Sequence, residues 1–105
     1  MNDTDNITRD ILSMLHRHGH AAWRQNAAHV RGRRTPKDSQ GIGDIVAVLA
    51  PDGRHLEVEV KVNRDTLRDS QVKHSQLVTG AGGIHKVVHS LDEFLSWWQE
   101  FSSDN

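Results

Sequence analysis

Apolar and polar residues alternate strictly over residues 55–62, and this pattern anchors the prediction of the fold. The even positions are aliphatic and, from Glu57 onward, the odd positions are charged, as expected when strand side chains point to alternate faces. The charged residues on the shared face are Glu57, Glu59 and Lys61. The preceding run, 44–50, is apolar on both faces after Asp44, which is typical of a central strand. The intervening "PDG" favours a tight turn, so a hairpin is predicted.

Helical periodicity and capping signals predict the remaining elements. The expected elements are a helix over 6–18, a strand over 21–26 with Trp23 buried, strands over 44–50 and 55–62, a helix capped by Asp69 or Ser70 and running to about Thr79, a strand over 84–89, and a last helix opened by Ser90 and Glu93. Residues 28–40 show no periodicity and are expected to form a mobile loop. The order α, β, β, β, α, β, α predicts the α/β class, as an α+β mixed sheet with helices on its faces.

Length and composition restrict the possibilities. A chain of 105 residues is expected to form a single domain, 1–105. No apolar run reaches the roughly 18 residues of a membrane span and no secretory signal is present, so we expect a soluble, intracellular protein. The absence of cysteine excludes disulfides and Cys-ligated zinc, which leaves carboxylate, carbonyl, water or histidine ligands for any metal.

The net charge of −1 does not by itself point to a nucleic-acid partner, but the basic residues are unevenly distributed. Between residues 24 and 37 no acidic residue occurs, while five are basic: Arg24, Arg31, Arg33, Arg34 and Lys37. Such a block could bind phosphates, or it could be a solvated loop. In the neighbouring "WRQN", Arg24 and Asn26 are either polar anchors of the first strand or contacts with a DNA backbone.

The register of the hairpin decides whether its charged residues form a site. With an even number of residues in the turn, Asp44 lies on the face of Glu59 and Lys61, near Lys61; an odd number places it on the opposite face. Two adjacent carboxylates suit Mg²⁺ or Mn²⁺, with the backbone carbonyl of Val60 as a further ligand. Lys61 could then position a water or stabilise a transition state. The alternative is an exposed, salt-bridged strand face.

The arrangement of motifs resembles the PD-(D/E)XK nuclease superfamily and, within it, the small stand-alone VRR-NUC domains. The resemblance covers nearly the whole chain, through "WRQN" at 23–26, "GIGDIVAV" at 41–48, "GRHLEVEVK" at 53–61, "SQVKH" at 70–74, "GG" at 82–83 and "VVHSLDEF" at 87–94. It implies a restriction-endonuclease-like αβββαβα core.

By position, the resemblance implies that Asp44 and Glu59 bind metal, that Lys61 is the catalytic lysine and that Gln71 supports the site. The chain departs from the family's pattern at two places. Gly43 stands where a proline usually precedes the motif aspartate. The glutamate common near the start of the first helix is absent, and Asp5, with a shorter side chain, is the weaker candidate metal ligand in its place.

The resulting hypothesis is a Mg²⁺- or Mn²⁺-dependent DNA endonuclease. The resemblance implies a homodimer acting on branched DNA such as four-way junctions, in the cytoplasm of a bacterium or a phage-infected cell. His74, three residues after Gln71 on the same side of its helix, could approach a phosphate. Two other classes stay open: a non-catalytic nucleic-acid-binding module with the nuclease fold, and an interaction domain with a solvated charged face.

Overall fold

The computed structural model describes residues 3–25, 44–62 and 66–103. The elements in chain order are α1 (Asp3–Arg17), β1 (Ala21–Arg24), β2 (Ile45–Leu49), β3 (Arg54–Val60), α2 (Asp69–Gly80), β4 (Ile84–Val88) and α3 (Leu91–Ser103). This order confirms the predicted fold class. The first helix begins at Asp3 rather than Asn6, and strands β1 and β3 end two residues earlier than predicted.

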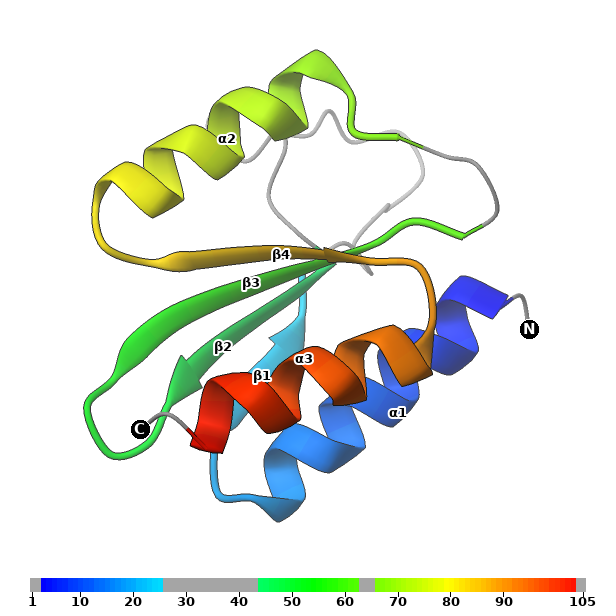
Figure 1. The fold of residues 1–105 in the computed structure, drawn as a ribbon, viewed down its shortest axis with the longest axis vertical. Coiled ribbons are helices and arrows are strands. Elements are labelled where there is room, and N and C mark those ends of the chain that lie inside the picture. Colours follow the sequence, from blue (N-terminus) through cyan, green and yellow to red (C-terminus); the bar gives the residue numbers. More distant parts are fainter. Residues whose placement is uncertain (1–2, 26–43, 63–65, 104–105) are drawn as a thin grey trace.

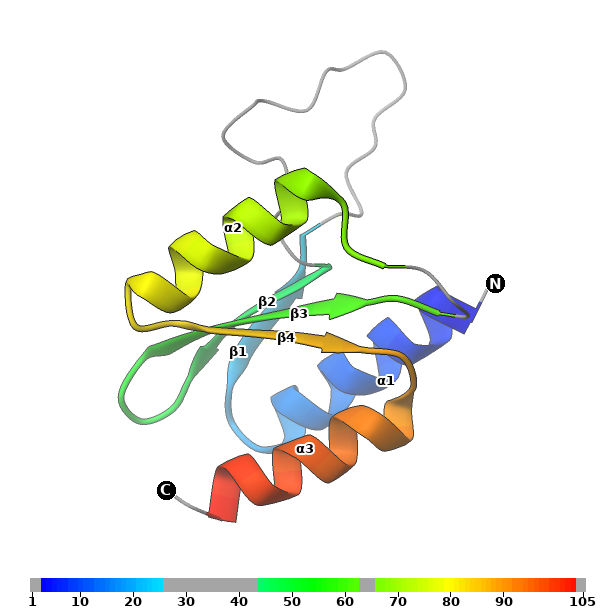
Figure 2. The ribbon, with the colours of Figure 1, turned by 45° about the horizontal axis from the view of Figure 1, so that its top comes forward.

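The four strands form one mixed sheet in the order β1-β2-β3-β4. The β1–β2 and β2–β3 pairs are antiparallel, and β3 and β4 are parallel. Helix α2 lies on one face of the sheet, and α1 and α3 lie on the other (Figures 1 and 2). The apolar run of β2 therefore occupies an inner position, as predicted. No helix in the described ranges is long and apolar enough to cross a membrane.

The hydrophobic core fills the layer between the sheet and the pair α1 and α3. Its buried residues are Ile11, Met14, Leu15, Ile45, Ala47, Leu49, Leu56, Val58, Val60, Val88, Phe94 and Trp98. The adjacent Trp97 packs at the margin of this cluster and stacks on Phe101. Trp98 lies in the core and Trp97 at its margin because neighbouring helical positions point in different directions.

The opposite face of the sheet is polar where α2 covers it. Glu57 and Glu59 of β3 are only 3% and 2% exposed, and Gln71 of α2 is 3% exposed. The alternative of an exposed charged strand face is therefore wrong, because α2 covers these side chains.

The prediction that Trp23 is buried is also wrong, since the residue is 45% exposed. Trp23 pairs with Val46, which in turn pairs with Glu57, so its side chain points to the face that carries α2. Helix α2, however, packs over β4 at the far edge of the sheet and leaves β1 uncovered. The indole Nε1 instead donates a hydrogen bond to Gln25 Oε1 at 2.9 Å.

The turn between β2 and β3 fixes the register of the hairpin. Leu49 pairs with Arg54, so residues 50–53 form a turn with an even number of residues. Gly53 closes it with a φ of +78°, a left-handed conformation that glycine adopts without steric cost, and its N–H donates to Leu49 O at 2.7 Å. At the other end of the hairpin, Ile45 pairs with Val58. Asp44 therefore faces Glu59.

Candidate active site

Asp44 and Glu59 meet where β2 begins and β3 ends. Asp44 directly precedes β2, and its backbone carbonyl accepts a hydrogen bond from Gln25 N–H at 2.9 Å. Its Oδ2 accepts a second one from Val60 N–H at 2.8 Å. The register is even, which is the alternative that places the two carboxylates on one face, but the residue opposite Asp44 is Glu59, two positions before the expected neighbour Lys61. The structure thus brings the two predicted metal ligands side by side.

The carboxyl group of Glu59 is enclosed by protein. Its Oε1 accepts a hydrogen bond from Gln71 Nε2 at 2.9 Å and lies 3.7 Å from Lys61 Nζ. Its Oε2 is buried and has no hydrogen-bond partner among the described residues. Burial, and after it the negative charge of Asp44, raises the pKa of Glu59 from 4.5 to about 7, while Lys61 and Arg68 oppose the shift. The protonated form also gains a hydrogen bond to the Asp44 side chain, which adds to the rise in pKa. An added cation beside Oε2 would stabilise the ionised form.

Gln71 ties the first turn of α2 to this carboxylate. Its Nε2 donates to Glu59, and its Oε1 accepts a hydrogen bond from Arg68 N–H at 2.8 Å. Arg68 is the N-cap of α2, so the predicted caps, Asp69 and Ser70, lie inside the helix. Both ends of the Gln71 amide are occupied, which fixes its orientation and that of Glu59.

Replacing Gln71 with methionine is expected to destabilise the fold by about 1–3 kcal/mol, because Glu59 Oε1 loses its donor in a buried region and Arg68 N–H loses its acceptor in a partly buried one. Urea unfolding of the metal-free protein measures the change. Gln76→Met is the matched control, since Gln76 is exposed on the same helix and its side chain makes no contact of this kind. Equal stability of the two variants would contradict a hydrogen-bonding role for the Gln71 amide.

The oxygen atoms of Asp44, Glu59 and the Val60 carbonyl are suitable ligands for a hard divalent cation. In the described ranges, no group of three or more His, Asp or Glu side chains could hold a metal ion, so the available side chains are Asp44 and Glu59. Since the N–H of Val60 points toward Asp44, its carbonyl, on the same side of the extended strand, points that way too. Mg²⁺ is commonly held by one or two carboxylates and keeps several waters. Glu59 Oε2, which accepts no hydrogen bond among the described residues, is the oxygen of this pair with a free lone pair for a cation.

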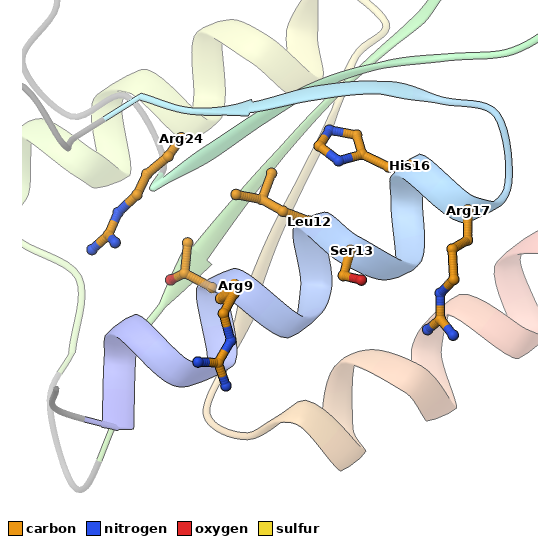
Figure 3. A pocket seen from close by; sticks show the side chains of 7 residues that line it. Arg9, Leu12, Ser13, His16, Arg17 and Arg24 are labelled. Atoms are coloured by element: carbon orange, nitrogen blue, oxygen red, sulfur yellow. The ribbon is translucent and has the colours of Figure 1, made fainter.

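Asp5, the weaker candidate ligand, forms an ion pair with Arg24 Nη2. Arg24, a predicted DNA contact, also lines a groove of about 530 Å³ between α1 and β1. The groove is lined by Thr8, Arg9, Leu12, Ser13, His16, Arg17 and Arg24, with no carboxylate among them. Figure 3 shows Arg9, Ser13 and Arg17 along one side of α1. Sequence reasoning missed Arg9 and Arg17, although their spacing of eight residues places them on one helix side.

The structure also reveals a second buried carboxylate that the sequence analysis did not assign. His74, expected to approach a phosphate, has its Nε2 2.7 Å from Glu57 Oε1. His55 Nε2 lies 2.6 Å from Glu57 Oε2. The alternation of β3 already placed Glu57 on the face of Glu59, so this signal was available. The remaining predicted DNA contacts lie outside the described residues: Asn26, Arg31, Arg33, Arg34 and Lys37.

Comparison with known proteins identifies a solved structure with a similar fold. No family model and no curated protein matches the chain. Among solved structures, one described as a VRR_NUC domain superimposes with a TM-score of 0.71 and 18% sequence identity, covering 95% of this chain and 97% of that chain. The Holliday junction resolvase Hjc of Archaeoglobus fulgidus superimposes with a TM-score of 0.47 and 26% identity, over 78% of this chain and 66% of that chain. The chain therefore has the fold of the VRR_NUC domain, the fold that its sequence motifs predicted.

Proposed function

We propose that this chain is a divalent-metal-dependent DNA endonuclease that hydrolyses phosphodiester bonds with Asp44, Glu59 and Lys61 at its centre. The observation that carries the proposal is the pairing of Asp44 with Glu59 on one face of the sheet, where Glu59 Oε2 is buried without a hydrogen-bond partner. A buried carboxylate oxygen in this condition costs free energy, and a bound cation offsets that cost.

Each of the central residues has a separate task in the proposed reaction. Asp44, Glu59 and the Val60 carbonyl would hold Mg²⁺ or Mn²⁺, and when bound the cation stabilises negative charge that develops on a phosphate. The Lys61 side chain is 14% exposed and its ammonium lies 3.7 Å from Glu59 Oε1, so it can orient the attacking water or donate to a phosphate oxygen. Gln71 keeps Glu59 in place from the first turn of α2.

The groove between α1 and β1 supports DNA as the substrate. Its lining includes three arginines, which suit phosphate groups because guanidinium binds them through paired hydrogen bonds. Arg9 and Arg24 are paired with Asp10 and Asp5, so a phosphate would compete with these carboxylates. Arg24 at its end is followed by Gln25, whose N–H donates to Asp44 O. The groove lies on the sheet face that carries α1, so DNA bound there would reach the proposed cleavage site around the β1 edge of the sheet.

A homodimer acting on branched DNA is the more specific form of the proposal, and the family resemblance of the motifs supports it. One site of this size cuts one strand, and two-fold symmetry presents two such sites to two strands.

Cleavage of labelled DNA tests the proposed function. Four-way junction, linear duplex and single-stranded DNA are each incubated with the protein in Mg²⁺, in Mn²⁺ and in EDTA. We expect cutting with either metal and none in EDTA, with the junction cut fastest. Asp44→Asn should abolish cutting, whereas Asp52→Asn, in the exposed hairpin turn, should not. If the folded parent bound DNA but cut none of the substrates, the proposal would fail and a non-catalytic binding module would replace it.

A further inference from the structure

The face of β3 beneath α2 carries a second carboxylate whose two oxygens are both occupied. Glu57 is 3% exposed; its Oε1 accepts a hydrogen bond from His74 Nε2 at 2.7 Å and its Oε2 one from His55 Nε2 at 2.6 Å. His85 of β4 lies beside Glu57 in the strand register. A carboxylate buried to this degree is costly without partners, so the two imidazole contacts are an integral part of how this region packs.

Helix α2 has few apolar contacts with which to hold its place. Gln71 is its only fully buried residue. Of its apolar residues, Val72 and Leu77 are 39% and 72% exposed, and only Val78 is half-buried. In contrast, α1 and α3 insert apolar side chains into the core. The position of α2 over β3 therefore depends strongly on polar contacts, which are directional and require correctly placed partners.

Two of these polar contacts are side-chain hydrogen bonds that join α2 to β3 at neighbouring positions. Gln71 and His74 are three residues apart and share one side of α2. Their acceptors, Glu59 and Glu57, are two residues apart and share one face of β3. The hydrogen bond from Gln71 to Glu59 belongs to the candidate site, and the hydrogen bond from His74 to Glu57 lies one helical turn further along α2.

We propose that His74 and Glu57 form a positioning pair, which holds α2 in the place where Gln71 can reach Glu59. This role rests on the proposed nuclease function for its effect on cleavage, while its structural effect is independent of that function. His74 acts through α2 and touches neither metal nor substrate. Loss of the hydrogen bond from His74 to Glu57 makes the first turns of α2 more mobile. The hydrogen bond from Gln71 Nε2 to Glu59 Oε1 is then formed for a smaller fraction of the time.

Amide hydrogen exchange of the metal-free protein tests the structural half of the proposal. In His74→Ala, we expect exchange in α2 to be about 10- to 100-fold faster than in the parent, the factor expected for loss of a hydrogen bond to a charged group. Exchange in α1 and β2 should remain unchanged. His74→Gln, whose amide N–H can reach the same Glu57 oxygen, should restore slow exchange. Gln76→Ala, on the exposed side of α2, is the control and should leave exchange as in the parent.

Steady-state cleavage at saturating Mg²⁺ tests the functional half. His74→Ala should lower kcat by about 10-fold or more with KM for DNA unchanged, since the residue positions the site and does not bind substrate. His74→Gln should recover most of this loss. Unchanged α2 exchange, a uniform rise in exchange across all elements, or a His74→Gln variant as defective as His74→Ala would each overturn the proposal. If the parent shows no cleavage, the nuclease function fails, and the exchange experiment still decides whether the pair positions α2.

Discussion

Replacing Lys61 with methionine is expected to lower the rate of DNA cleavage by about 100- to 1,000-fold, the range found when one stabilising donor is removed from an active site. Lys61 Nζ is the cationic side-chain group 3.7 Å from Glu59 Oε1, and the side chain is only 14% exposed. Methionine retains most of the aliphatic stem, so the packing of this side chain is largely preserved while the ammonium is lost. Single-turnover cleavage in saturating Mg²⁺ measures the chemical step directly.

Lys73→Met is the matched control, because Lys73 is exposed on α2 and the same change there removes one positive charge from the surface. We expect it to affect cleavage by less than about threefold, with any loss arising from weaker DNA binding at high salt. Lys61→Met should bind DNA nearly as well as the parent, which fluorescence anisotropy in Ca²⁺ or EDTA can measure. A Lys61→Met enzyme that cleaves as fast as the Lys73→Met control would remove Lys61 from the proposed mechanism.

Strand periodicity is the reason that much of the site could be predicted from the sequence. The alternation over 55–62 placed Glu57 and Glu59 on one face without any knowledge of the rest of the fold. The position of Asp44 depended on the parity of the turn at 50–53, which local sequence left open and the structure fixes as even. Such short-range features are set by the backbone within a hairpin.

The contacts made by α2 could not be predicted in the same way, because they join residues far apart in the sequence. The burial of Gln71 depends on where α2 crosses β3, and this helix lacks the apolar stripe that normally indicates a buried side. The contact between His74 and Glu57 spans 17 residues and depends on that same crossing. The exposure of Trp23 likewise follows from which edge of the sheet α2 leaves uncovered.

The metal-free protein is expected to lose stability as pH rises from 4.5 to 7, and Glu59→Gln is expected to abolish that part of the loss. The folded protein holds the proton of Glu59 up to a pKa of about 7, whereas the unfolded chain loses it near the ordinary value of 4.5. Below pH 4.5 the carboxyl is protonated in both states and has no effect. Between the two values the unfolded state releases its proton first, so unfolding becomes more favourable; above pH 7 the full loss remains.

The size of the effect follows from the two pKa values. One pKa unit corresponds to about 1.4 kcal/mol, so the difference is worth about 3 to 4 kcal/mol at pH 8. Glutamine keeps an oxygen for Gln71 Nε2 and turns its own amide N–H toward the Asp44 carboxylate, so the variant loses the charge and retains the contacts. Urea unfolding at pH 4 and pH 8 should show equal stability at the lower pH and a more stable variant at the higher one.

Addition of Mg²⁺ at pH 8 should reverse the order of the two proteins. A cation that binds the folded state alone stabilises it by mass action, so the Tm of the parent should rise with Mg²⁺ concentration while that of Glu59→Gln stays nearly constant. Glu100→Gln, an exposed position on α3, is the control and should follow the parent in both experiments. Because every other titrating group is common to parent and variant, their difference isolates Glu59. A difference that stays constant from pH 4 to pH 8 would mean that this carboxyl ionises normally in the folded protein, and the argument for a cation beside its Oε2 would then lose its electrostatic basis.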